Sequence, residues 1–158
     1  MNIKKAIIAA LLALPLTGQA KDVVWYSGGH VTYSVQKKYG TVVDKALKMF
    51  ESDMHAVTGK RAQQRDKAGI EVYQLDLANN KEMKQLGKYN VPYHKFITKS
   101  DAFWIGIRKG KIIVVGSNGR GTAYGILELS REAGVSPWIY WGDVKPVRRR
   151  SLTIDEHF

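Results

Sequence analysis

Residues 112–134, IIVVGSNGRGTAYGILELSREAG, join an apolar run, a glycine-rich turn and an amphipathic segment. The continuously apolar run at 112–115 is typical of a strand that is covered on both faces. The segment from about 122 to 133 predicts a helix that stops at Gly134. Its inner stripe consists of small and apolar residues: Ala123, Ile126, Leu127 and Ser130. The stretch therefore predicts a buried strand, a tight turn and a helix that packs on the sheet.

The glycines of this turn allow two interpretations. Gly119, Gly121 and Gly125 resemble a dinucleotide-binding fingerprint, in which a pyrophosphate approaches backbone amides at a helix N-terminus. Residues 126–158, however, contain no further strand, helix and ribose-binding acid in the order that such a fold requires. No Gly-Lys-Ser/Thr triplet supports a phosphate-binding Walker loop. We therefore favour the second interpretation, in which Gly121 and Gly125 let the helix approach the sheet closely.

The rest of the chain alternates strand and helix patterns. Residues 102–108 and 111–116 flank a Lys109-Gly110 turn and predict a β-hairpin. Other segments are predicted as an apolar-aromatic stretch at 22–26, strands at 31–35 and 70–77, helices at 41–57 and 80–86, and a loop at 88–100. This order predicts an α/β (α+β) sandwich, with a mixed sheet of about four to five strands and two main helices.

The helix at 41–57 has the clearest pattern. Its apolar residues recur in steps of three and four: Val43, Ala46, Leu47, Phe50, Met54 and Val57. Thr41 followed by Asp44 suggests a start similar to a capping box, and Gly59 is a natural stop.

Length and composition exclude several classes of protein. The 158 residues give room for one ordinary domain, but not for a complete (β/α)8 barrel of roughly 200 residues or more. The absence of cysteine excludes a disulfide scaffold, a thiol nucleophile and a thiolate metal site. The 25 Lys and Arg against 14 Asp and Glu give a net charge of +11, which favours an anionic partner.

Residues 1–20 have the pattern of a secretory signal peptide. Lys4 and Lys5 precede an uncharged run at 6–16, and Gly18 and Ala20 provide small residues for cleavage after Ala20. The run is too short for a membrane span, which needs about 20 residues. We expect a secreted or periplasmic protein, without a membrane span, whose mature charge is +9 after the two lysines are lost. Export weakens the case for nucleic acid as the anionic partner.

Local motifs for chemistry are missing. The histidines, His30, His55, His94 and His157, show no zinc-binding spacing. No serine stands in a Gly-x-Ser-x-Gly elbow, and no carboxylate pair is marked by its spacing. We therefore predict no catalytic residue, no metal site and no cofactor. A small enzyme whose site assembles from distant residues is the interpretation that we favour least.

Two features follow the last predicted helix. Trp138, Tyr140 and Trp141 form an aromatic cluster, which we interpret as core or interdomain packing, with sugar contact as the alternative. Lys145 and residues 148–150 form a basic run, typical of a solvated linker, with an acidic partner as the alternative. We expect a domain at 21–144 and a basic linker or the start of a barrel at 145–158.

Residues 114–144, VVGSNGRGTAYGILELSREAGVSPWIYWGDV, resemble the N-terminal domain of glycoside hydrolase family 115, the xylan α-1,2-glucuronidases. That domain carries a similar run: strand, Arg-Gly-Thr-x-Tyr-Gly, helix, Gly-Val-Ser-Pro-Trp, Trp-x-Asp-Val. The resemblance extends weakly over 31–150 and includes the Val57-Thr58-Gly59 helix end. Similar domains precede the barrels of family 67 α-glucuronidases and family 20 hexosaminidases. The resemblance implies a sandwich like domain 2 of the hexosaminidases.

In that family the barrel that follows performs the cleavage, and Phe158 falls where a barrel should begin. The resemblance thus implies an accessory domain that is inactive alone, because no catalytic residue of the family maps onto it. Its expected partner is a catalytic (β/α)8 barrel, in cis or as a separate chain. Arg120 and Asp143 could pair with each other or dock against that barrel. Candidates for binding or docking are Arg120, Tyr124, Trp138, Tyr140, Trp141 and Asp143.

Two functions remain open at this point. The first is a non-catalytic domain that supports an exported xylan-degrading glycoside hydrolase. The alternative is a free-standing secreted module that binds acidic xylan or oligosaccharides through its tryptophans and positive charge.

Overall fold

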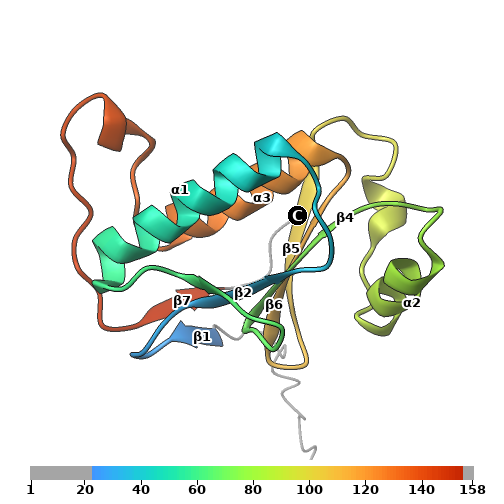
Figure 1. Ribbon diagram of the computed structural model, residues 1–158, viewed down its shortest axis with the longest axis horizontal. Coiled ribbons are helices and arrows are strands. Elements are labelled where there is room, and N and C mark those ends of the chain that lie inside the picture. Colours follow the sequence, from blue (N-terminus) through green and yellow to red (C-terminus); the bar gives the residue numbers. More distant parts are fainter. Residues whose placement is uncertain (1–22, 155–158) are drawn as a thin grey trace, which may run out of the picture.

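The computed structural model describes residues 23–154, except the side chain of Tyr140. Within this range the chain forms three α-helices, a five-stranded mixed sheet and a two-stranded sheet (Figure 1). The elements are β1 Val23–Tyr26, β2 Thr32–Val35, α1 Thr41–Thr58, β3 Gln63–Gln64, β4 Ile70–Gln74, α2 Asn80–Lys88, the 3₁₀ turn η1 Tyr93–Lys95, β5 Phe103–Arg108, β6 Lys111–Gly116, α3 Gly119–Glu132, the 3₁₀ turn η2 Pro137–Tyr140 and β7 Leu152–Ile154. The predicted α/β sandwich is confirmed.

The large sheet has the strand order β3-β2-β4-β6-β5. Its first four strands are parallel, and β5 pairs antiparallel with β6. The predicted hairpin is confirmed: Lys109 and Gly110 both have positive φ values, 54° and 73°, which suits the tight turns of twisted hairpins.

Helices cover both faces of this sheet. α1 and α3 lie side by side on one face, over a core that includes Phe50, Met54 and Ile126 (Figure 1). α2 and η1 lie on the other face, over a second core that includes Tyr73 and Trp104. The central strand β6 is buried on both faces, as its continuous apolar run predicts.

α3 packs closely on the sheet because of its glycines. A Cβ on Gly125 would lie 2.7 Å from Val114 Cγ1, and a Cβ on Gly121 would clash with the carbonyl oxygen of Ala102. The close-packing interpretation of the glycine turn is therefore confirmed. The helix begins at Gly119, three residues earlier than predicted, because the Asn118 side chain accepts a hydrogen bond from the Gly121 amide at 2.8 Å.

The predicted stops of the two main helices, at Gly59 and Gly134, are confirmed. Both glycines have a left-handed backbone conformation, with φ values of 85° and 95°. After α3 the amide of Val135 donates to the carbonyl of Ser130 at 3.0 Å, as in a Schellman motif. The predicted capping box of α1 is wrong: Gly40 is the N-cap, and no side chain caps this end.

The small sheet was not predicted. β7 pairs antiparallel with β1, with Val23 opposite Ile154, and both Leu152 and Ile154 are buried in the core. The predicted signal peptide at 1–20 lies outside the described residues. Of the helices described, none has the length and hydropathy needed to cross a bilayer.

Candidate functional site

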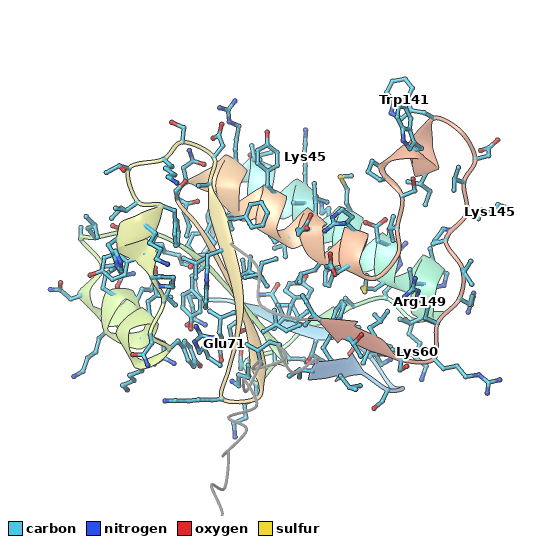
Figure 2. The ribbon with its side chains drawn as sticks, turned by 180° about the vertical axis from the view of Figure 1, so that it is seen from behind. Lys45, Lys60, Glu71, Trp141, Lys145 and Arg149 are labelled. Atoms are coloured by element: carbon cyan, nitrogen blue, oxygen red, sulfur yellow. The ribbon has the colours of Figure 1, made fainter. Side chains whose placement is uncertain are left out.

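A long excursion of the chain, residues 135–150, connects α3 to β7; we call it the arm. It stands away from the sheet and the helices, as the orange-to-red loop of Figure 1 shows. η2 forms its outer turn, where the Ser136 hydroxyl accepts a hydrogen bond from the Trp138 amide at 3.2 Å. Trp141 lies at the outer end of the arm (Figure 2).

The arm exposes large apolar side chains. Trp141 is 85% exposed and Trp138 is 67% exposed, and Val144 and Val147 also face solvent. The interpretation of these tryptophans as core residues is therefore wrong, because the chain leaves the body of the domain before it reaches them. Interdomain packing stays a prediction. Such an apolar patch on a surface is typical of an interaction site.

A groove of about 420 Å³ lies beside the base of the arm. Its walls are mainly apolar side chains from α1, α3, β5 and the arm: Met49, Phe103, Tyr124, Leu127, Val135, Pro137 and Ile139. Tyr124 is half exposed at the groove. The arm thus contributes Pro137 and Ile139 to the groove, whereas its tryptophans face solvent outside the groove lining.

Five polar residues interrupt the apolar lining: Asp53, Glu128, Ser130, Arg131 and Ser136. Asp53, from α1, and Ser130, from α3, both line the groove, and Asp53 is only 5% exposed. Burial raises the pKa of the Asp53 carboxyl, and the neighbouring Ser130 hydroxyl offsets part of that rise. An apolar hollow with a few buried polar groups is the usual composition of a binding site.

Arg120 does not pair with Asp143. Its Nε donates to Asp101 Oδ1 at 3.0 Å and its Nη2 donates to Asp101 Oδ2, which holds the pKa of Asp101 below its usual range. Asn118 Nδ2 also donates to Asp101 Oδ1 at 3.0 Å. Asp143 is exposed on the arm. The predicted Arg120–Asp143 pair is therefore replaced by a pair that ties the start of α3 to the loop before β5.

The basic run returns the arm to the body. Arg148 lies against Gly59 and Arg149 lies against Gly134, so that each guanidinium adjoins the C-terminal end of a main helix (Figure 2 labels Arg149). The amide of Arg149 also donates to the carbonyl of Val57 at 2.9 Å. Positive side chains at helix C-termini are favourable, so part of the basic charge has a structural use.

The predicted candidates thus fall into two groups. Tyr124 lines the groove, Trp138, Trp141 and Asp143 are exposed on the arm, and the backbone of Tyr140 ends η2. Arg120 stands apart, paired with Asp101. Sequence reasoning missed Asp53 and Ser130, although Asp53 shares its helix with the apolar stripe. Among residues 23–154, no group of three or more His, Cys, Asp or Glu side chains could hold a metal ion.

Comparison with solved structures gives a match over most of the chain. A family GH115 4-O-methyl-α-glucuronidase, BtGH115A, with specificity for decorated arabinogalactans, superposes with a TM-score of 0.74 and 31% identity over 87% of this chain. This chain matches the N-terminal part of a GH115 α-glucuronidase. The resemblance deduced from residues 114–144 is therefore confirmed. The match spans 18% of the length of the GH115 enzyme.

A family GH138 enzyme that targets the pectin rhamnogalacturonan II matches over 68% of this chain and 10% of its own, with 18% identity and a TM-score of 0.46. Neither the protein-family models nor the curated proteins gave a match.

Proposed function

We propose that this chain is a non-catalytic accessory domain of an exported xylan α-glucuronidase-like glycoside hydrolase. It supports carbohydrate degradation by packing against a catalytic (β/α)8 barrel, in cis or as a separate chain. The observation that carries the proposal is the match to a small part, 18%, of a much longer GH115 enzyme. The lack of a catalytic motif in the sequence supports the same conclusion.

The arm and the groove are the surface that we assign to this contact. Exposed tryptophans on the arm and an apolar groove at its base have the composition of a docking site, in which a few aromatic anchors supply most of the binding energy. In this proposal Trp138 and Trp141 insert into the catalytic domain, while Tyr124 and the groove receive an apolar side chain from it.

Site-specific cross-linking tests the contact. A photo-cross-linking amino acid replaces Trp141 in the full chain expressed in its native host, and cross-linked proteins are identified by mass spectrometry. The same amino acid at Lys45, which is exposed on α1 (Figure 2), is the control. We expect position 141 to cross-link to a glycoside-hydrolase barrel and position 45 not to do so. No barrel at position 141, or the same cross-link from both positions, would contradict the proposed surface.

Export is part of the proposal and rests on the pattern of residues 1–20. N-terminal sequencing of the protein from the cell exterior or periplasm tests it. We expect the mature chain to begin at Lys21, after cleavage behind Ala20. An uncleaved chain inside the cell would contradict export.

A second function is favoured by the exposure of Trp138 and Trp141 together with the net positive charge. In this alternative the chain is a free-standing secreted module that binds acidic glycans. Affinity electrophoresis in glucuronoxylan distinguishes the two. If the chain is such a module, we expect glucuronoxylan to retard it in a salt-sensitive way. Trp141→Ala should abolish this retardation while the fold stays intact. Absence of retention on any acidic glycan would remove this alternative.

A further inference from the structure

A second hollow lies on the face of the sheet opposite the groove, between α2 and the strands β2 and β4; we call it the α2 cleft. Its volume is about 360 Å³. α1 follows β2 on one face of the sheet, whereas α2 follows β4 on the other. The cleft therefore lies where connections from neighbouring parallel strands diverge, which is where open α/β sheets usually bind ligands.

Several polar side chains of the cleft are held in place by paired contacts. Glu71, on the sheet face that α2 covers, accepts hydrogen bonds from Lys111 Nζ at 2.5 Å and from the Tyr73 hydroxyl at 2.7 Å (Figure 2 labels Glu71). Lys37 Nζ, after β2, donates to Asp76 Oδ2 at 2.7 Å. These pairs give the cleft a fixed polar wall.

Glu82, from the first turn of α2, is different. It is only 6% exposed, and it lines the cleft. Its Oε1 accepts a long hydrogen bond of 3.5 Å from the Tyr39 hydroxyl, whereas its Oε2 has no hydrogen-bond partner among the described residues. Lys37 Nζ lies 3.9 Å from Oε2, beyond hydrogen-bond distance. Burial raises the pKa of Glu82. A buried acceptor of this kind is unfavourable until a donor reaches it.

The other side chains define the chemistry of that donor. Gln36 and Gln85 also line the cleft, and their amides can both donate and accept hydrogen bonds. The positive charges of Lys37 and Lys81 balance the negative charges of the two lining carboxylates, Glu71 and Glu82. The lining therefore favours neither a cation nor an anion. A neutral molecule with several hydroxyl groups fits such a lining, because each hydroxyl donates and accepts.

We propose that the α2 cleft binds one neutral sugar unit, with a ring hydroxyl donating to the Glu82 carboxylate and others bonding the amides of Gln36 and Gln85. The volume is near the lower end of the roughly 300–1,000 Å³ found for small-molecule sites, which suits a single ring. The inference does not depend on docking through the arm, because the two surfaces lie on opposite faces of the sheet.

NMR titration of the full chain tests the inference. The probes are the neutral sugars D-galactose and D-xylose, with D-glucuronate as the charged comparison. We expect a neutral sugar to shift the amide signals of residues 36–37 and 79–85, with a dissociation constant of about 1 mM or weaker. Glu82→Leu should weaken binding about tenfold, the loss expected for one charge-assisted hydrogen bond. Lys84→Ala, an exposed change on the same helix, is the control and should leave binding unchanged.

Gln85→Ala keeps the test decisive if Glu82→Leu fails to fold, because Gln85 is only partly buried. It should also weaken binding and leave the spectrum of the free chain otherwise intact. Three results would overturn the inference: no shift in the cleft with either neutral sugar, stronger binding of D-glucuronate than of the neutral sugars, or equal binding by wild type and Gln85→Ala. None of these results would bear on the cross-linking at position 141, so failure of this inference can be distinguished from failure of the proposed function.

Discussion

Asp53 lies at the groove with its carboxylate almost fully buried, and burial raises its pKa. We expect Asp53→Asn to stabilise the chain at pH 7, because the variant does not bury a charge. The unfolded chain loses this proton near pH 3.9 and the folded chain loses it at a higher pH. Stability from this group is therefore complete below about pH 3.9 and is lost as pH rises through the folded pKa.

Thermal unfolding at several pH values measures this effect. The melting temperature of Asp53→Asn should exceed that of wild type at pH 7, and the difference should close on acidification. A variant less stable than wild type at pH 7 would mean that the carboxylate is stabilised by contacts that outweigh its burial.

Glu71 behaves in the opposite way. Burial acts to raise its pKa, but hydrogen bonds from Lys111, Tyr73 and Tyr89 outweigh burial and lower it. Its stabilisation is therefore present above the unfolded pKa of about 4.3 and is lost as pH falls through the folded pKa. Glu71→Gln should lower the free energy of unfolding by about 1–3 kcal/mol at pH 7.

Urea denaturation at pH 7 and below pH 4 measures the effect of Glu71→Gln. Asp66→Asn, at an exposed carboxylate, is the control and should stay within about 0.5 kcal/mol of wild type. If both variants behave alike, the network around Glu71 does not stabilise the fold.

At the scale of elements, the contact of α3 with the sheet depends on glycine. Gly125→Ala places a Cβ 2.7 Å from Val114 Cγ1 and 3.3 Å from Phe103 Cβ, so we expect a loss of about 1–3 kcal/mol. Gly87, inside α2, has no atom within 4 Å of an added Cβ. Gly87→Ala should therefore stabilise by about 0.4–1 kcal/mol. Urea denaturation compares them, and equal effects would refute the close-packing account.

Elements with a strong period were predictable from the sequence, because the buried face repeats within one element. The stripe of α1 and the hairpin β5–β6 are examples. β7 was not predictable, because a strand of three residues has too short a pattern and its partner β1 lies at the other end of the domain. The capping of α1 was mispredicted because Thr41 already has helical geometry, so it cannot act as the cap.

At the scale of the whole molecule, the candidate residues could be chosen from the sequence, but their burial and their neighbours in the fold could not be predicted from it. The large apolar side chains of Trp138 and Trp141 suit either a core or a binding surface. Only the path of the arm shows that they lie on the surface. The same holds for Asp53 and Ser130, which come from two helices and meet at the groove only in the folded chain. Periodicity describes one element at a time, whereas a site depends on how several elements are arranged.

The central claim is that this fold performs no glycoside cleavage by itself. The most direct test incubates the purified full chain with glucuronoxylan and measures released glucuronic and 4-O-methylglucuronic acid by chromatography, against heat-denatured chain. The accessory-domain account predicts no release above that of the denatured control. Release of either acid by the native chain alone would contradict it.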